Sequence, residues 1–584
     1  MRLWLIAALA TSALGGCATS RHDAGAAMVV TASYGIQTSS ASTNLKLPAC
    51  APARYPLLPL PGEAFANLSL PELASRLSKG DVTSECLAAA YVVRMDALDV
   101  TPSDSPPDKD EDEGMRTARA AYPPGLHAII AINPHAFADA RASDARRKAG
   151  KLLGPLDGIP ILLKDNIESW DDTATTAGSL ALAENRPQRD APLVRRLTDG
   201  GAIILGKTNL SEWANFRSSR SLSGWSAVGG QARNPYALDR SPCGSSAGSA
   251  VAVAAGYAPA AIGTETDGSI TCPAAVNGIV GLKPTVGLIS RTGIVPISHT
   301  QDTPGPMTRT VRDAALLLTA MAGSDPADPA TAQADAHKTD YAAALDANSL
   351  KGKRIGVLRF AAGFHPETDA AFEAALGVMR AKGAILVDIP ALPHRRDIGN
   401  KETIVLNTEF KVDLNAYLAT TDPAKVKTRT LADVIAFDRA HPAEEMALFG
   451  QDTFEEAEAT KGLDDPVYIA AKADAHRMAG PEGIDALLSQ YDVVALVAPT
   501  LGPAWPIDPV LRDRYVGGGA GSLAAVAGYP HLTVPMGLVG GLPVGLSFIG
   551  PAWSEARLLS LGYAYEQASK ARRPPTFALT VSAP

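Results

Sequence analysis

The chain has 584 residues, of which 46% are hydrophobic and 20% are charged. These are ordinary globular proportions, so they exclude a disordered, collagen-like or coiled-coil protein. The formal net charge of −8 gives no electrostatic footprint for nucleic acid. Length alone, at about 150 residues per domain, would suggest roughly four domains.

The first 17 residues resemble a bacterial lipoprotein signal. A basic residue precedes the apolar run 3–13, and the sequence Leu14-Gly15-Gly16-Cys17 follows it. Cleavage there would leave Cys17 as a lipidated N-terminus; an ordinary signal peptide cut near Ala-Thr-Ser is the alternative. Residues 18–61 are rich in Ser, Thr, Ala and Pro, which predicts a flexible tether. We therefore expect an exported protein, periplasmic or anchored to the outer membrane only through the lipid on Cys17.

The folded part is predicted to begin with a helix whose N-terminal cap is Ser69. Glu72 stands three residues later, as in a capping box, and an amphipathic stretch continues through Leu98. Residues 101–115 are strongly acidic and polar and cannot bury apolar surface, so they predict an exposed insertion.

Short apolar runs alternate with helical patterns along the rest of the chain, which predicts an α/β fold with a largely buried sheet. The runs are 128–132, 160–163, 202–205, 260–264, 354–358, 384–387, 493–497, 531–534 and 544–549. Because no further stretch has the composition of an interdomain linker, we predict one large domain, residues 62–584, rather than four.

The spacing of cysteines and histidines does not indicate a metal site or a catalytic thiol. Five cysteines are too few for a disulfide scaffold in so long a chain, and none of them shows CxxC spacing. The ten histidines include no HExxH motif. We therefore expect neither a metal nor another cofactor.

One segment matches the phosphate-loop pattern GxxxxGK[ST], namely Gly201-Ala-Ile-Ile-Leu-Gly206-Lys207-Thr208. A phosphate loop needs a solvated turn after a strand, with its N–H groups directed at the anion. The four variable residues here are apolar and predict a buried strand instead. We therefore reject nucleotide binding at this segment.

A second segment, Gly244-Ser245-Ser246-Ala247-Gly248, matches the nucleophile elbow GxSxG with Ser246 as nucleophile. An elbow must end a buried strand, but residues 234–243 are polar and contain two prolines, which indicates a loop. No downstream histidine is marked out by its surroundings. The elbow remains the alternative enzyme mechanism.

Three separated segments give the strongest indication of function. In 154–166, Lys164 ends an apolar, strand-like run that would draw it into the interior. In 241–250, a turn dense in glycine and serine opens an apolar helix. In 263–273, a tight glycine-containing loop with Ser269 leaves a short strand.

Together these segments resemble the amidase signature family, hydrolases that use a Ser-cisSer-Lys triad. The resemblance runs from the helix near Ser69 to the segments 527–535 and 541–550. It implies a single α/β domain with a twisted mixed β-sheet flanked by helices, and a signature core at about residues 150–310.

The resemblance also implies roles for individual residues. Lys164 matches the catalytic lysine, Ser245 the bridging serine whose preceding peptide bond is cis, and Ser269 the acylated nucleophile, 24 residues beyond Ser245. The backbone N–H groups of Thr266, Asp267, Gly268 and Ser269 match the oxyanion hole.

The chemistry is consistent with these roles. A serine hydroxyl needs a base to become a nucleophile. Lysine can serve only when neutral, so its pKa must fall from about 10.4 to about 7 or 8 through burial. Lys164 on its apolar run satisfies this requirement.

Several neighbouring residues are expected to have supporting roles. Asp165, Asn166 and Asp302 also lie in family motifs, where capping and hydrogen bonding are expected at least as much as direct catalysis. Cys243 and Cys272 flank the two serines, and we expect them to pack as small hydrophobic side chains.

The segments Glu265-Thr-Asp-Gly-Ser-Ile-Thr-Cys-Pro and Ser223-Gly-Trp-Ser-Ala-Val-Gly-Gly-Gln-Ala-Arg-Asn-Pro resemble the peptide amidase branch of the family. This implies hydrolysis of the C-terminal amide of peptides with release of ammonia. An amidase of other small acyl or aryl amides is one alternative, and a catalytically idle envelope binding protein on this fold is another. The sequence does not indicate an oligomeric state.

Overall fold

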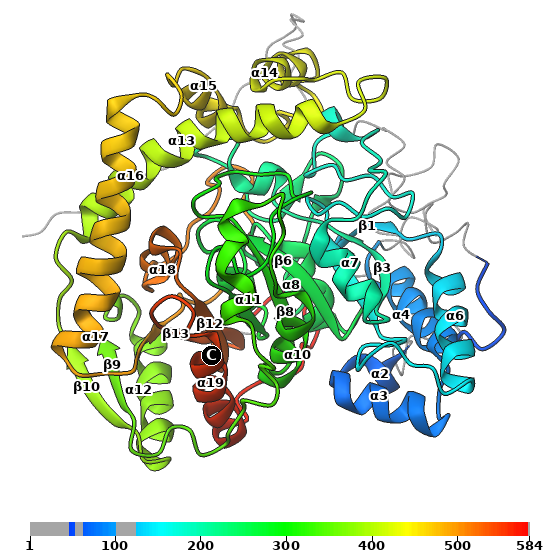
Figure 1. Cartoon of the computed structure of the whole chain (residues 1–584), viewed down its shortest axis with the longest axis horizontal. Coiled ribbons are helices and arrows are strands. Elements are labelled where there is room, and N and C mark those ends of the chain that lie inside the picture. Colours follow the sequence, from blue (N-terminus) through cyan, green and yellow to red (C-terminus); the bar gives the residue numbers. More distant parts are fainter. Residues whose placement is uncertain (1–45, 53–61, 101–123, 582–584) are drawn as a thin grey trace, which may run out of the picture. The chain divides into compact units, whose positions relative to one another are not determined.

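The computed structural model describes residues 46–52, 62–100 and 124–581 (Figure 1). The predicted signal peptide (1–17) and acidic insertion (101–115) lie outside these residues, as does most of the predicted tether. All described residues belong to one unit, Gly35–Pro584.

Eleven strands form a single mixed sheet in the order β1-β3-β2-β6-β8-β7-β12-β13-β11-β9-β10, and β4 and β5 form a separate two-stranded ribbon. The strands are β1 (Ile129–Ile132), β2 (Pro160–Lys164), β3 (Ile203–Thr208), β4 (Trp225–Ser226), β5 (Gly230–Gln231), β6 (Ala260–Glu265), β7 (Val280–Lys283), β8 (Thr303–Thr308), β9 (Arg354–Leu358), β10 (Ile385–Ile389), β11 (Ala495–Pro499), β12 (His531–Val539) and β13 (Leu542–Ile549). The predicted single α/β domain with a mixed sheet is confirmed, and each of the nine predicted runs overlaps a strand.

The α-helices are α2 (Glu63–Ala66), α3 (Leu70–Lys79), α4 (Ser84–Leu98), α6 (Ala136–Lys148), α7 (Pro192–Asp199), α8 (Ala247–Ala255), α9 (Thr271–Val276), α10 (Val311–Met321), α11 (Ala334–His337), α12 (Pro366–Ala381), α13 (Arg395–Thr420), α14 (Leu431–Ala440), α15 (Asp452–Glu458), α16 (Pro466–Ala479), α17 (Ala486–Gln490), α18 (Gly521–Ala527) and α19 (Glu555–Ser569). Short 3-10 turns are η2 (Leu180–Leu182), η3 (Glu212–Asn215), η4 (Pro329–Gln333) and η5 (Arg359–Ala361), and η6 (Gly480–Asp485) is a π-turn. No helix within the described residues combines the length and apolarity needed to cross a bilayer.

The predicted capping box at the start of α3 is confirmed. The Ser69 backbone N–H and hydroxyl both donate to the Glu72 carboxylate, at 2.8 and 2.7 Å. In the other half of the box, the Ser69 side chain accepts the backbone N–H of Glu72. This first-turn N–H lacks a partner within the helix, so the exchange fixes where α3 begins.

Both faces of the sheet are covered. In β11, Ala495 and Val497 belong to the largest hydrophobic core, whereas Leu496 and Ala498 belong to a second core. Because successive side chains of a strand point to opposite faces, these two cores lie on opposite sides of the sheet. The first contains residues of α8, α10, α12 and α19, and the second contains residues of α16, α17 and α18. Burial on both faces explains why the strands are continuous apolar runs.

A third hydrophobic cluster packs α13, α14 and α15 against loops that lead to the site (Figure 1). Phe410 and Phe454 from these helices belong to it, together with Trp213, Val295 and Ile297 from the loops. Helices α13, α14 and α15 therefore pack against and support residues 295–297, in the loop before β8.

Two strands of the eleven-stranded sheet, β7 and β8, are missing from the predicted runs, as are the two short strands of the ribbon, β4 and β5. β8 has the sequence Thr-Pro-Gly-Pro-Met-Thr, whose prolines argue against a strand inside a sheet. In the structure Pro304 pairs with Thr264 and Pro306 with Ile262 of β6. β8 pairs with β7 only at Met307 and Thr308. The two prolines therefore precede the part of β8 that pairs with a strand on each side, where a missing N–H would break the pairing.

Two disulfides join four of the cysteines, Cys50 to Cys86 and Cys243 to Cys272. The prediction that Cys243 and Cys272 pack as separate small hydrophobic side chains is wrong. Their Cα atoms lie 6.1 Å apart, within bonding reach, although 29 residues separate them. Cys50 falls inside the predicted tether, which is therefore fastened to α4 at this point.

Candidate active site

The predicted triad residues meet at the carboxyl ends of two parallel neighbours, β2 and β6. Lys164 is the last residue of β2, and Ser269 lies four residues after the end of β6. Ser245 precedes α8, which packs against both strands. Ligands of open α/β sheets bind at such strand ends, so the topology brings these three segments to one place.

Lys164 is fully buried and its amine is surrounded by oxygen atoms. Its Nζ lies 2.7 Å from Ser245 Oγ, 2.8 Å from Thr264 Oγ1 and 3.3 Å from the Thr264 carbonyl oxygen. If the amine is neutral, it can donate to Thr264 and accept a proton from the Ser245 hydroxyl.

Burial lowers the pKa of Lys164 to about 7, and the nearby carboxylates of Asp302 and Glu265 oppose this shift. The cause is desolvation, because an ammonium loses more hydration than an amine when it is buried. An appreciable fraction of Lys164 is therefore neutral near pH 7.

The backbone of Ser245 is held by the loop after β3. The Gly244–Ser245 peptide bond is cis, as the family resemblance implies. The Ser245 carbonyl accepts the Ser211 N–H at 3.0 Å. A Cβ at Gly244 would lie 2.1 Å from Ser211 Oγ, so only glycine fits against this neighbour.

Ser246, the candidate of the elbow alternative, is engaged by the β6 backbone. Its hydroxyl donates to the Thr264 carbonyl at 3.0 Å and accepts the Thr264 N–H at 3.2 Å. The residues before it form a loop and not a strand. This geometry disfavours the elbow, in which the hydroxyl must project from the end of a strand.

The loop that carries Ser269 is anchored at both ends. The Glu265 carboxylate accepts the N–H groups of Ile270 and Thr271 at 2.8 and 2.9 Å. The Asp302 carboxylate accepts the Thr266 hydroxyl at 2.5 Å. Gly268 has a φ of 79°, in the left-handed region that favours glycine.

Asp302 connects the loop 266–269 to residues 297–298, which lie in the loop before β8. Its second oxygen accepts the N–H groups of Ile297 and Ser298 at 2.8 and 2.9 Å. Burial raises the pKa of Asp302 to about 6, against the effect of these donors. Asp302 therefore holds the loop 266–269, and its charge acts on Lys164.

The structure brings the segments that carry Ser245 and Ser269 together through the backbone. The Ser246 N–H donates to the Ser269 carbonyl at 3.1 Å. Among the hydrogen bonds of the described residues, none joins the Ser269 hydroxyl to Ser245. Ser269 is buried, with 7% exposure.

Asp165 and Asn166 have the supporting roles expected of them. Asn166 Nδ2 donates to Thr264 Oγ1 at 3.0 Å, on the same oxygen that faces Lys164. The Asp165 carboxylate accepts the backbone N–H and the hydroxyl of Thr176. Burial raises the pKa of Asp165 to about 6.

Sequence reasoning missed two residues of this site, Thr264 and the carboxylate of Glu265. Both are polar side chains at the end of a predicted apolar strand, which is the one local signal that could have singled them out. Their partners, Lys164 on one side and residues 270–271 on the other, become visible only in the folded chain.

The rejection of the phosphate-loop motif is supported by the structure. Residues 203–208 form the buried strand β3. Lys207 is fully buried, and its Nζ donates to the Ile167 carbonyl and to Thr175 Oγ1, at 2.5 and 2.9 Å. This lysine is committed to these internal acceptors and cannot reach a phosphate.

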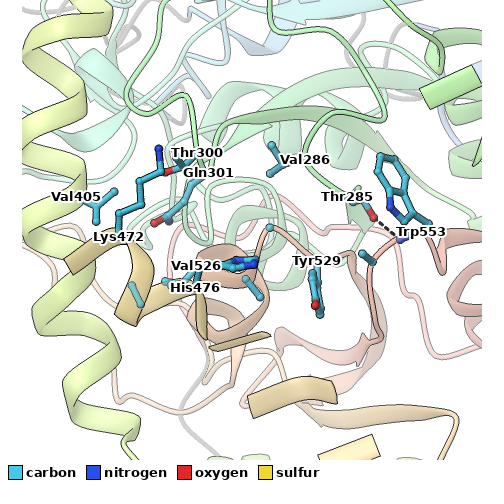
Figure 2. Close-up of a pocket in the computed structure, with 14 residues that line it drawn as sticks. Thr285, Val286, Thr300, Gln301, Val405, Lys472, His476, Val526, Tyr529 and Trp553 are labelled. Carbon is cyan, nitrogen blue, oxygen red and sulfur yellow. Dashed lines mark hydrogen bonds between the residues drawn. The ribbon is translucent and has the colours of Figure 1, made fainter. Parts of the chain in front are cut away.

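A cavity of about 390 Å³ lies beside Gln301, in the loop before β8 (Figure 2). Gln301 lines it and donates from Nε2 to the Thr266 carbonyl at 3.3 Å and to Glu402 Oε1 at 2.8 Å. Figure 2 shows Lys472 beside Gln301, with Trp553 across the cavity. Gln301 therefore connects the wall of the cavity to the loop 266–269 through one hydrogen bond.

Three potential metal ligands, His299, Glu409 and Asp413, lie together beside α13. His299 Nδ1 lies 2.9 Å from Asp413 Oδ2, and its Nε2 lies 3.3 Å from Glu409 Oε1. The Lys472 ammonium lies 3.4 Å from Glu409. The neighbouring carboxylates raise the pKa of His299, and the Lys472 ammonium pairs with Glu409, so these groups form a charged hydrogen-bond network.

The fold and the site define an amide hydrolase. The Amidase family model matches residues 116–559, and the chain belongs to this family, which hydrolyses amide C–N bonds. A probable amidase of Arabidopsis thaliana is 40% identical over 464 residues, 78% of this chain and 85% of that protein.

Among solved structures, the chain is similar to the peptide amidase of Stenotrophomonas maltophilia. The identity is 52% and the TM-score 0.80, covering 88% of this chain and 99% of that one. The peptide amidase has also been solved with the competitive inhibitor chymostatin, with a TM-score of 0.81 at 52% identity, covering 88% and 100% of the two chains. One component of the glutamyl-tRNA(Gln) amidotransferase of Chloroflexus aurantiacus is 36% identical over 511 residues, 86% of this chain and 96% of that protein.

Proposed function

We propose that this protein hydrolyses the C-terminal amide of peptides and releases ammonia, using Ser269 as nucleophile, Ser245 as proton relay and Lys164 as base. The observation that carries the proposal is the 2.7 Å contact between Lys164 Nζ and Ser245 Oγ in a fully buried setting. Burial lowers the pKa of Lys164 to about 7, so the base can be neutral at physiological pH.

In the first half-reaction, Ser269 Oγ attacks the carbonyl carbon of the substrate amide. Its proton passes to Ser245 while the Ser245 proton passes to the Lys164 amine. The tetrahedral oxyanion forms beside the backbone N–H groups of 266–269. When the C–N bond breaks, Ser245 returns a proton to the nitrogen, ammonia leaves, and the acyl group remains on Ser269.

The second half-reaction reverses these roles. Water attacks the acyl carbon, and its proton passes through Ser245 toward Lys164. Collapse of the intermediate releases the peptide acid and restores the Ser269 hydroxyl. Each proton taken up by Lys164 is returned, so no net acid or base is consumed at the triad.

The nucleophile loop has donors for the oxyanion. In the described part of the chain, no hydrogen bond outside the regular helices and strands uses the backbone N–H of Asp267, Gly268 or Ser269. Glu265 and Asp302 fix the two ends of the loop. Preorganised donors of this kind contribute more to catalysis than mobile ones.

The substrate class rests on similarity and on the motifs around Ser223 and Glu265. The 52% identity with a peptide amidase favours peptide amides over other small acyl or aryl amides. Amidated dipeptides, simple acyl amides and aryl amides should be compared by released ammonia or amine. Turnover of simple or aryl amides alone would remove the peptide amide assignment.

The triad is tested by covalent labelling with a fluorophosphonate followed by peptide mapping. We expect the label on Ser269, and its loss in Ser269→Ala. Ser246→Ala is the matched control, because this neighbouring hydroxyl contacts only the Thr264 backbone. A label that persists in Ser269→Ala but disappears in Ser246→Ala would restore the elbow mechanism. Wild-type protein that takes no label and hydrolyses no amide would instead support an idle binding protein.

We also propose that the protein is exported and carries lipid on Cys17. Disulfides persist in oxidising compartments, and four of the five cysteines are paired in two disulfides. Cys17 is the cysteine left over, and it stands at the predicted cleavage site. Expression in a bacterium fed an alkyne-tagged fatty acid should label the wild-type protein and leave Cys17→Ala unlabelled. Equal labelling of both would contradict the assignment.

A further inference from the structure

The Cys243–Cys272 disulfide joins the two segments that bear the proposed catalytic serines. Cys243 lies two residues before Ser245, and Cys272 lies three residues after Ser269. Cys272 belongs to the first turn of α9, and its backbone N–H donates to the Gly268 carbonyl at 2.8 Å. The covalent link is therefore within three residues of both serines in the sequence.

Other contacts between these segments lie on either side of the disulfide. Asn277 Nδ2 donates to the Pro242 carbonyl at 2.9 Å. The Ser246 N–H donates to the Ser269 carbonyl at 3.1 Å. Single hydrogen bonds break and reform readily, whereas the disulfide sets an upper limit on the separation of the two segments.

Cys243 itself is buried, with 7% exposure, and has a φ of 56°. This left-handed conformation is uncommon for a residue other than glycine. This unusual backbone conformation lies directly before Gly244–Ser245. A side chain bonded to α9 at this point constrains the turn that presents Ser245.

We propose that Cys243 and Cys272 are positioning residues, whose disulfide sets the distance between Ser245 and Ser269. This rests on the proposed function, in which a proton crosses from one hydroxyl to the other. Proton transfer needs a heavy-atom distance of about 2.6–3.2 Å. A displacement of about 1 Å in a catalytic group can cost about a hundredfold in rate.

The other disulfide supplies a matched control. Cys50 and Cys86 are separated by 36 residues, against 29 for Cys243 and Cys272, so the two crosslinks restrict the unfolded chain to a similar degree. None of the hydrogen bonds that hold Lys164, Ser245 or Ser269 involves Cys50 or Cys86. Removing either disulfide should therefore lower the stability of the protein by a similar amount. Only removal of Cys243–Cys272 should alter the relative position of Ser245 and Ser269.

The experiment compares Cys243→Ala/Cys272→Ala with Cys50→Ala/Cys86→Ala, each assayed well below its own Tm. The readouts are kcat, KM and the rate constant for fluorophosphonate labelling of Ser269. We expect the first variant to lose at least about tenfold in kcat and in labelling rate, with KM within about twofold of wild type. The control variant should keep all three within about twofold.

If the first variant does not fold, the control variant Cys50→Ala/Cys86→Ala, whose remaining disulfide is Cys243–Cys272, is treated with dithiothreitol and then with iodoacetamide. The disulfide takes up two electrons and two protons to give two thiols, and dithiothreitol closes to its cyclic disulfide. Protein alkylated at Cys243 and Cys272 should show the same loss of kcat.

Full activity without the Cys243–Cys272 bond would overturn the proposal, as would losses in both variants that simply follow their Tm values. A wild-type enzyme that is never labelled on Ser269 would refute the proposed triad instead. The two failures are therefore distinguishable.

Discussion

The Nζ of Lys164 lies 2.7 Å from the Oγ of Ser245, although the two residues are 81 positions apart in the chain. Lys164 ends β2, and Ser245 precedes the helix α8 that packs on β2. The contact forms inside the protein, where an ammonium is poorly solvated and the neutral amine is favoured.

The pH dependence of activity should report the pKa of Lys164. Because burial lowers this pKa to about 7, the neutral base is lost below that pH. We expect kcat/KM to fall about tenfold for each pH unit below pH 7 and to level off above it. Lys164→Arg should be inactive at every pH, since arginine stays protonated. A flat wild-type profile between about pH 5.5 and 8.5 would contradict the role of Lys164 as base.

Thr264→Val should lower the stability of the protein. The valine keeps the shape of the side chain but removes the oxygen that faces Lys164 Nζ at 2.8 Å and Asn166 Nδ2 at 3.0 Å. Leaving buried donors unpaired should lower the free energy of unfolding by about 1–3 kcal/mol.

The same change should move the acidic limb of the pH profile. An acceptor stabilises the ammonium form, so its loss lowers the pKa of Lys164 and shifts the limb to lower pH. Thr264→Ser retains the hydroxyl and should behave like wild type. An acidic limb that does not move in Thr264→Val would contradict contact between this oxygen and Lys164, the proposed base.

Asp302→Asn should lower kcat by about tenfold to a hundredfold, because it disturbs the loop that presents the proposed oxyanion donors. The carboxylate accepts the Thr266 hydroxyl and the backbone of residues 297 and 298. Its charge also raises the pKa of Lys164, so the neutral variant should shift the acidic limb to lower pH.

Asp325→Asn is the matched control for Asp302→Asn. Asp325 anchors a loop in the same manner, accepting the hydroxyls of Ser290 and Thr292 at 2.6 Å each. It should lose stability but keep kcat and the pH profile. Similar kinetic losses in both variants would assign the effect of Asp302 to folding alone.

The two disulfides should contribute about equally to stability. The chain-entropy relation for loops of 36 and 29 residues predicts about 4 kcal/mol for each. Denaturant unfolding of the two double alanine variants, compared with wild type, measures both values. A loss much larger at Cys243–Cys272 would mean that this bond holds native structure beyond its crosslinking effect.

Local patterns predicted much of the fold. Nine apolar runs predicted strands, and Ser69 with Glu72 predicted the start of α3, because these features depend on neighbours in the chain. The ordered motifs around Lys164, Ser245 and Ser269 predicted the family. β8 escaped prediction because whether Pro304 and Pro306 are tolerated depends on which strands pair with them.

The sequence by itself determined the α/β class, the single large domain, the amidase family and the segments that carry the site. Only the tertiary structure decided that Cys243 meets Cys272, that Thr264 faces Lys164, and that Asp302 holds Thr266. The physical reason is one of distance. Periodicity and caps arise between residues a few positions apart, whereas disulfides, buried hydrogen bonds and lowered pKa values require groups from distant segments to meet away from water.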